Sequence, residues 1–208
     1  ELFKIKPDYD LDLMREGQTL AQLTAGIFTH LDPVLEDIKP DWVLAVGDTT
    51  TVVTTCQLAF YRRIKFGHVE AGLRTHNKWH PFPEEINRRL ATTMADMHFA
   101  PTIWSQKNLL HEGVDEKTIF VTGNPVIDAL QYVAAQDEPK EIKELLVRLG
   151  IASPAARNDG KKLILVTAHR RENFGEPMEN ICHALKDLAS RGDVEVVYPV
   201  HLNPNVQE

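Results

Sequence analysis

The chain has 208 residues, of which 43% are hydrophobic, enough for a packed core in one large domain or in one and a half ordinary ones. Its 23 Lys and Arg residues against 30 Asp and Glu residues give a formal net charge of -7, and no basic cluster is dense enough to follow a phosphate backbone, which argues against a nucleic acid as partner. The longest apolar runs are far shorter than the roughly 20 residues that a membrane helix needs, which argues against a membrane protein.

The first predicted elements are a helix and a buried strand. Apolar residues at helical spacing predict a helix over residues 20–38, which ends at Lys39 because Pro40 disfavours the helical conformation in the residue before it. The apolar run 42–46, closed by Gly47, predicts a strand that is buried on both faces of a parallel sheet.

Helices and strands then alternate. The predicted helices span residues 49–61, 84–94 and 102–111, and the predicted strands lie at 68–69, 97–100 and 119–121. This alternation predicts an α/β fold with a doubly wound parallel sheet, which binds its ligands beyond the carboxyl ends of the strands. We assign residues 1–132 to this first domain.

A second α/β unit is predicted after a connector. Residues 133–160 are charged, helical in their middle and interrupted by turn residues, so we interpret them as the connector. Residues 161–208 then contain a strand, a helix and a second strand, which we interpret as the start of a second domain. Because the chain starts without Met and stops just after a strand, we expect a fragment at both ends.

The cysteines and histidines do not predict a metal site. Cys56 and Cys182 fall in helical patterns without CxxC spacing, so we expect two free buried thiols in a reducing cytoplasm. His76 and His80 have an H-x3-H spacing, but they lie in a loop and lack a suitably spaced third ligand. The phosphate-binding patterns GxGxxG and GxxxxGK[ST] are also absent, and we predict no cofactor.

Three carboxylates stand where a parallel sheet presents its ligand-facing edge. Asp48 and Glu70 each follow a predicted strand, and Glu84 starts the next helix. Acids that converge on one crevice can serve as general acid and base. The alternative for Asp48 is a helix N-cap that accepts from the amide of Thr50 or Thr51.

The helix that Glu84 starts carries two candidate ion pairs. Glu84 and Arg88 lie one turn apart, as do Glu85 and Arg89, so each pair can be a simple surface contact, and only one of them can face the crevice. The helix N-terminus favours an anion, which is either Glu84 itself or a bound phosphate.

A basic cluster follows the first strand of the second unit. Residues 169–173 place the guanidinium groups of Arg170 and Arg171 beside the imidazole of His169, which suits a pyrophosphate. The alternative is a charged loop exposed to solvent.

Taken together, five segments resemble the motifs of the non-hydrolysing UDP-N-acetylglucosamine 2-epimerases. They occur in the order of the family, and the second and third are highly specific. These segments are residues 47–51 (GDTTT), 68–75 (HVEAGLRT), 81–88 (PFPEEINR), 121–128 (VTGNPVID) and 167–173 (TAHRREN).

The resemblance implies a glycosyltransferase-B-like fold, with two Rossmann-like domains around a cleft, and a homodimer. It implies that the acid and base groups are Asp48, Glu70 and Glu84, with His169 beside the nucleotide as a further catalytic group. The expected substrate-binding residues are Arg88, Arg170, Glu172 and His201. A second UDP-sugar can act as an allosteric activator in the family, and Arg170, Glu85 or His201 would contact it.

The implied reaction interconverts UDP-N-acetylglucosamine (UDP-GlcNAc) and UDP-N-acetylmannosamine (UDP-ManNAc), a precursor of polysaccharides, without a redox cofactor. Because C2 of the sugar carries no acidic proton, a base removes that proton as UDP departs, which leaves 2-acetamidoglucal. UDP then adds again while an acid protonates the opposite face. Two faces need two proton-handling groups, and the departing anion needs cationic groups such as Arg170.

Other functions remain open at this point. A glycosyltransferase of the same architecture would pass a similar sugar to an acceptor, and a sugar-nucleotide sensor would bind it without turnover. A hydrolysing epimerase is a third alternative. Members of the family also contain an N-terminal strand and a complete second domain that this chain lacks.

Overall fold

The computed structural model describes residues 3–151, 160–168 and 173–200. The chain divides into two compact units, Glu1–Asp128 and Ala129–Glu208, and each is described by itself. The division falls inside helix α5 (Pro125–Ala134).

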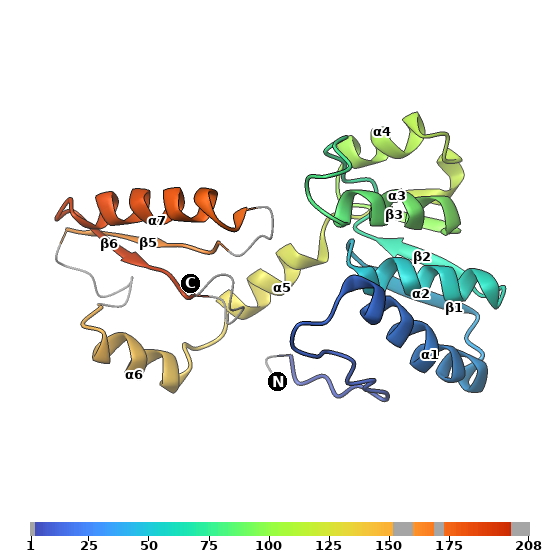
Figure 1. Cartoon of the computed structure of the whole chain (residues 1–208), viewed down its shortest axis with the longest axis horizontal. Coiled ribbons are helices and arrows are strands. Elements are labelled where there is room, and N and C mark those ends of the chain that lie inside the picture. Colours follow the sequence, from blue (N-terminus) through green and yellow to red (C-terminus); the bar gives the residue numbers. More distant parts are fainter. Residues whose placement is uncertain (1–2, 152–159, 169–172, 201–208) are drawn as a thin grey trace. The chain divides into compact units, whose positions relative to one another are not determined.

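The first unit contains a four-stranded parallel sheet in the order β1-β2-β3-β4 (Figure 1). Its register pairs Val46 with Val69, Val69 with Phe99, and Ala100 with Val121, so the carboxyl ends of all four strands meet at one edge. The strands are β1 (Trp42–Val46), β2 (Lys65–Val69), β3 (Met97–Ala100) and β4 (Ile119–Val121). The predicted α/β fold with parallel strands is confirmed.

The helices of this unit begin and end close to their predicted limits. Thr19 and Gln22 form a capping box at the start of the first helix, and Lys39 ends it in the left-handed conformation (φ 48°) ahead of Pro40. The helices are α1 (Leu20–Ile38), α2 (Thr50–Tyr61), α3 (Glu84–Met94) and α4 (Ile103–His111), with a short 3-10 helix η1 (Glu116–Thr118) before β4.

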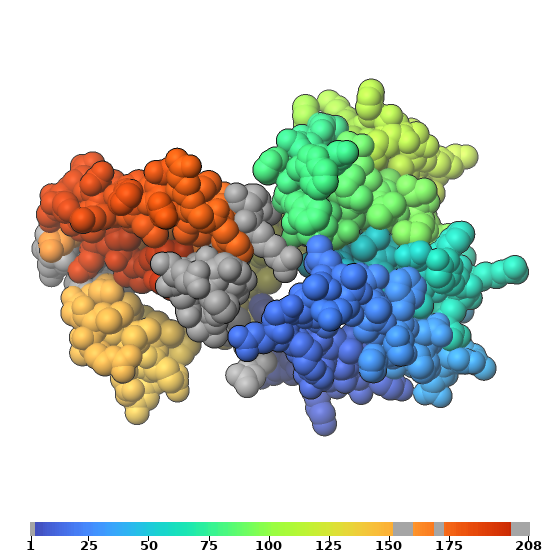
Figure 2. Space-filling model, in the orientation of Figure 1, coloured from blue at the N-terminus to red at the C-terminus, as the bar shows by residue number. Residues whose placement is uncertain are grey.

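The core of the first unit lies on one face of the sheet. Val52, Cys56 and Ala59 of α2 pack on Phe66 of β2, with Val43 of β1 against the same cluster. The helices α1, α2 and α3 form the side of this unit that faces the viewer in Figure 2. A second cluster joins α4 to β3 and β4 through Ala71, Ala100, Leu109 and Ile119.

The prediction that β1 is buried on both faces is wrong. Side chains alternate along a strand, so Val43 and Ala45 face the core whereas Leu44 and Val46 point to the opposite face. Leu44 is 63% exposed and Val46 is 58% exposed, because no described helix covers them. A continuous apolar run therefore does not show by itself that both faces of a strand are covered.

The second unit contains a two-stranded parallel sheet. Strands β5 (Lys162–Leu165) and β6 (Val194–Val197) pair in parallel, and helix α7 (Glu176–Ala189) connects them as a crossover helix. Helix α6 (Lys140–Arg148) lies within the predicted connector. Along the described ranges, no helix is both long and apolar enough to cross a membrane.

Both cysteines are free, as predicted, but only one is buried. Cys56 is fully buried, and burial raises the pKa of its thiol to about 12, so it is unreactive at neutral pH. Cys182 is exposed, so its predicted burial is wrong. Its position in the helical pattern of α7 did not reveal which side of the helix is covered.

Gly72 provides a first testable prediction, on stability. It follows Glu70 and Ala71 with φ +84°, and a Cβ placed there would lie 2.3 Å from the carbonyl oxygen of Ser105. Gly113 has a similar φ of +86° but no atom within 4 Å of such a Cβ. We expect Gly113→Ala to cost only the backbone strain, about 1–2 kcal/mol, and Gly72→Ala to cost about 1–3 kcal/mol more because of the steric clash.

Urea unfolding of the two variants measures this difference. Equal destabilisation by Gly72→Ala and Gly113→Ala would show that the close approach of α4 to residue 72 is not a constraint.

Candidate functional site

Two of the three predicted carboxylates lie together at the carboxyl edge of the first sheet. Asp48 comes two residues after β1, and Glu70 comes directly after β2. Because Val46 and Val69 are partners in the register, the two acids follow neighbouring strands at the same level. The sequence-based expectation that Asp48 and Glu70 converge thus agrees with the structure.

Arg88 of α3 joins the two carboxylates. Its Nε and Nη2 atoms lie 3.0 and 2.7 Å from Oδ2 of Asp48, and Nη2 also lies 2.9 Å from Oε2 of Glu70. Its Nη1 donates to the backbone carbonyl of Glu70 at 2.6 Å. The Arg88 side chain is only 8% exposed, so its planar guanidinium group is held in place as part of the site.

Glu70 is held in a strained and specific conformation. Its backbone lies in the left-handed region (φ 66°), which is uncommon for a residue with a side chain and typically costs about 1–3 kcal/mol. The other carboxylate oxygen, Oε1, accepts from Nδ2 of Asn124 at 3.0 Å. Asn124 follows β4, so a third strand end contributes to the site.

Asp48 does not cap helix α2. The N-cap residue is Thr49, and the Asp48 carboxylate is bonded to Arg88 instead, so the capping alternative is wrong. The Asp48 carbonyl accepts from Nδ2 of Asn87 at 2.8 Å, which ties this residue to α3 a second time. Within the described residues, the hydrogen bonds of the Asp48 carboxylate involve Oδ2, and Oδ1 has no partner.

Glu84 lies at the first position of α3, one turn before Arg88. It is half-buried, and it makes no ion pair with Arg88 or with any other described residue. The predicted pair Glu84–Arg88 is therefore not formed, because Arg88 is already bound to Asp48 and Glu70. Glu84 shares a helix face with Arg88 but is not bonded to the cluster.

Glu85 supports the loop that precedes α3. It is 1% exposed and accepts from the backbone amides of Thr75 and His76 at 2.9 and 3.1 Å, with Arg89 as its ion-pair partner at 3.3 Å. These contacts give Glu85 a structural role in holding the loop, and its expected contact with an activator stays a prediction. Of the two candidate ion pairs on α3, Glu85–Arg89 is formed and supports the loop, whereas Arg88 faces the carboxylates.

Arg74 is a second buried cation in this region, and the sequence analysis did not single it out. Its side chain is fully buried and makes two hydrogen bonds of 2.8 Å to Glu112, with a third, of 2.9 Å, to Thr92. These hydrogen bonds hold the pKa of the Glu112 carboxyl below its ordinary value. Arg74 thereby connects the loop after β2 to the end of α4.

The ion pair between Arg74 and Glu112 leads to a second testable prediction, on the pH dependence of stability. Because the folded pKa of Glu112 is lowered from 4.5, its contribution is fully present above that pH and is lost as the pH falls through the folded value. We expect Glu112→Gln to reduce the free energy of unfolding by about 1–2 kcal/mol at neutral pH, with the deficit shrinking in acid. Urea unfolding between about pH 3 and pH 7 measures this.

The matched control is Glu116→Gln, since Glu116 makes no ion pair with any described residue. A deficit for Glu112→Gln that is constant with pH would contradict the assigned role of its charge.

Four predicted site residues lie outside the described residues: His169, Arg170, Glu172 and His201. Their roles stay predictions. His76 and His80 are in the described loop between β2 and α3, where the His76 amide donates to Glu85. Across the part of the chain that is described, no three His, Cys, Asp or Glu side chains gather as a metal site would require.

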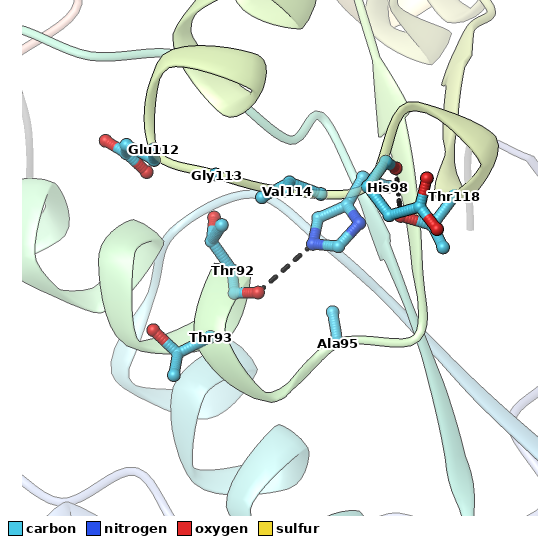
Figure 3. Close-up of a pocket in the computed structure, with 9 residues that line it drawn as sticks. Thr92, Thr93, Ala95, His98, Glu112, Gly113, Val114 and Thr118 are labelled. Atoms are coloured by element: carbon cyan, nitrogen blue, oxygen red, sulfur yellow. Dashed lines mark hydrogen bonds between the residues drawn. The ribbon is translucent and has the colours of Figure 1, made fainter.

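A cavity of about 340 Å³ lies away from the carboxylate cluster (Figure 3). Its lining includes Ala95 and Thr118, which come just before β3 and β4, so it is at the amino edge of the sheet. His98 at its side contacts the Thr92 carbonyl at 3.1 Å, and burial lowers the pKa of this imidazole. Because parallel sheets bind ligands at the opposite edge, we place the candidate site at Asp48 and Glu70.

The cluster has the composition of a site for proton transfer. Two carboxylates share one guanidinium, so two groups of the kind that can transfer a proton are held side by side on one cation. Donors from α3 and from the end of β4 fix the position of both acids. Asn124 and Asn87 were missed by the sequence analysis, although the position of Asn124 after a parallel strand is the signal that would have indicated it.

Comparisons with known proteins identify the family. The sequence matches the family described as UDP-N-acetylglucosamine 2-epimerase over residues 1–208. It is 52% identical to the UDP-N-acetylglucosamine 2-epimerase of Escherichia coli K12 and 50% identical to that of Campylobacter jejuni, over the whole chain. The chain spans 55% and 54% of the lengths of these two relatives.

Solved structures give the same result. The UDP-GlcNAc 2-epimerase of Neisseria meningitidis, bound to UDP-GlcNAc, is 46% identical with a TM-score of 0.85, over 99% of this chain and 54% of that one. The enzyme of Methanocaldococcus jannaschii, in complex with UDP-GlcNAc and UDP, is 30% identical with a TM-score of 0.79, over 98% of this chain and 52% of that one. The sequence match, the shared fold and the converging acids lead to one conclusion: the chain belongs to the UDP-N-acetylglucosamine 2-epimerase family.

Proposed function

We propose that the natural polypeptide carrying this chain interconverts UDP-GlcNAc and UDP-ManNAc by eliminating UDP and adding it back. The observation that carries the proposal is the pair of carboxylates, Asp48 and Glu70, held on the single guanidinium of Arg88 at the ligand-binding edge of the sheet. The relatives described above are named as UDP-N-acetylglucosamine 2-epimerases, and the Neisseria meningitidis structure has UDP-GlcNAc bound. Both findings support UDP-GlcNAc as the substrate.

In the proposed reaction, one carboxylate removes the proton from C2 of the sugar. The electron pair of that C–H bond forms the C1–C2 double bond as the bond from C1 to the UDP oxygen breaks, which gives 2-acetamidoglucal and UDP. A UDP oxygen then attacks C1, and an acid on the opposite face delivers a proton to C2. Asp48, Glu70 and Glu84 are the proposed proton-handling groups.

Arg88 has a positioning role in this proposal. Its hydrogen bonds hold Asp48 and Glu70 in one arrangement, so neither acid reorganises during proton transfer. His169 and Arg170 are proposed to stabilise the departing UDP, with Glu172 and His201 as further substrate contacts. We also propose a cytoplasmic homodimer, with a second UDP-GlcNAc as an allosteric activator.

Proton NMR in deuterated water tests the function. The natural polypeptide that carries this chain is incubated with UDP-GlcNAc and no added cofactor, and the sugar H1 and H2 signals are followed. We expect UDP-ManNAc to appear with deuterium at C2, because the acid that protonates the opposite face of C2 carries a deuteron from the solvent.

The other outcomes identify the competing functions. Free N-acetylmannosamine with UDP would indicate a hydrolysing enzyme, and turnover only after addition of an acceptor would indicate a glycosyltransferase. Binding without turnover would indicate a sensor. Each of these results would overturn the proposal.

A further inference from the structure

His68 is a buried polar residue directly behind the carboxylate cluster. It lies on β2, two residues before Glu70, and its side chain is fully buried. Its Nε2 atom is 2.7 Å from the carbonyl oxygen of Gly47, the residue before Asp48. A carbonyl oxygen can only accept, so Nε2 must carry a hydrogen and donate it.

The other ring nitrogen, Nδ1, has no hydrogen-bond partner among the described residues. A ring with one donating and one unprotonated nitrogen is neutral. The surroundings favour this state, because burial, together with the positive charges of Arg88 on α3 and Arg74 after β2 and the neighbouring His98 on β3, lowers the pKa of His68 to about 4. The Gly47 carbonyl acts in the other direction, but more weakly than burial.

Both backbone polar groups of Gly47 form hydrogen bonds with residues of β2. Its amide donates to the Val69 carbonyl at 3.0 Å, and its carbonyl accepts from His68. Its φ of +90° is one that glycine adopts without strain. The peptide that leads into Asp48 is therefore held by β2 on one side and by Asn87 and Arg88 of α3 on the other.

We propose that His68 is a positioning residue for the epimerase reaction: its Nε2–H group holds the Gly47 carbonyl and so keeps the Asp48 carboxylate on Arg88 beside Glu70. His68 itself is buried beneath the cluster and transfers no proton to substrate. The inference rests on the proposed function, since it assigns His68 to that reaction.

Two substitutions separate the hydrogen bond from simple packing. Gln can place its side-chain NH2 group near the position of the imidazole Nε2, whereas Leu fills a similar volume without a donor. We expect His68→Leu to lower kcat by about 10–100-fold with a small change in KM, because an error of about 1 Å in the position of a reacting group costs a factor of that size. His68→Gln should recover most of this loss.

A histidine with a purely structural role would give a different pattern. If packing alone mattered, Leu and Gln would have equal effects on kcat, and that result would overturn the inference. Thermal unfolding of both variants accompanies the kinetics, so that only folded protein is compared. Because His68 stays neutral in the working range, we expect the pH profile of His68→Leu to keep the shape of the wild-type profile.

NMR of the ring provides a readout that does not depend on turnover. The natural polypeptide is labelled with 15N-histidine, and the His68 signals are identified as those lost in His68→Gln. We expect a protonated Nε2 and an unprotonated Nδ1 from about pH 5 to pH 8. A proton on Nδ1 in this range, either as the other tautomer or as imidazolium, would overturn the inference.

The two proposals fail in different ways. Absence of C2 exchange in the wild-type protein contradicts the epimerase function, whatever the state of the ring. Normal C2 exchange with the wrong ring tautomer, or with equal effects of Leu and Gln, contradicts the role of His68 alone.

Discussion

Glu70→Gln is expected to lower the rate of UDP-ManNAc formation by about 10²–10⁴-fold, the usual contribution of a positioned acid or base. The amide has the shape of the carboxylate but cannot accept the proton from C2. It keeps one acceptor oxygen for either Arg88 or Asn124, so the cluster loses one hydrogen bond rather than its packing. Initial rates and deuterium incorporation at C2, measured together, check this expectation.

The control for Glu70→Gln removes a carboxylate elsewhere in the same unit. Glu116→Gln on η1 makes the same chemical change far along the chain from the cluster and should leave the rate unchanged. Loss of turnover with retained binding of UDP-GlcNAc would fit the proposed role. An unchanged rate in Glu70→Gln would remove Glu70 from the proton-transfer groups.

Arg88→Met is expected to damage both stability and activity. The substitution keeps an apolar stem of similar length but leaves Asp48 and Glu70, which are 24% and 21% exposed, without their shared cation. Leaving partly buried carboxylates unpaired costs about 3 kcal/mol in the free energy of unfolding. The rate should fall by at least about 10²-fold, because the positions of both acids depend on Arg88.

Arg89→Met is the matched control for this experiment. Arg89 is the next residue on the same helix, but its side chain is 44% exposed and makes one ion pair, to Glu85 at 3.3 Å. Glu85 is buried but keeps its two hydrogen bonds from the amides of Thr75 and His76, so we expect a smaller loss than in Arg88→Met, about 1–2 kcal/mol. Urea unfolding and initial rates of both variants test the difference, and equal losses in Arg88→Met and Arg89→Met would contradict the assignment of Arg88 to the cluster.

Arg88→Lys refines the interpretation. Lysine keeps the positive charge but lacks the planar fork, so it cannot bond Asp48, Glu70 and the Glu70 carbonyl at the same time. We therefore expect stability close to that of the wild type and a reduced rate. This split would show that the geometry of the guanidinium, and not only its charge, positions the acids.

The helices and strands of the first unit were predictable because local rules set them. Helix α3 and strand β3 have the predicted limits. Pro83 stands directly before the first residue of α3, and Pro101 directly after the last residue of β3. Strand β2 begins at Lys65, three residues before its predicted start, because its alternating residues do not form a continuous apolar run.

The rotation of each helix or strand about its own axis, which decides the side chains that face the core or the site, was not predictable to the same degree. The spacing on α3 is equally compatible with Arg88 or Arg89 in the site, and only the packing of α3 against α2 and β2 selects Arg88. The same holds for Leu44 of β1 and for Cys182 of α7, whose exposure depends on which neighbours cover them.

By itself, the sequence determined the α/β class, the parallel order of elements and the placement of Asp48 and Glu70 at strand ends. These features follow from hydrophobic periodicity and from the geometry of parallel sheets, which act over short stretches of chain. Only the tertiary structure decided that Arg88 bridges the two acids, that Glu85 is buried under the loop, and that Asn124 and His68 support the cluster. The reason is that these contacts join residues far apart in sequence, and the register of the strands and the rotation of the helices, rather than local spacing, bring them within hydrogen-bonding distance.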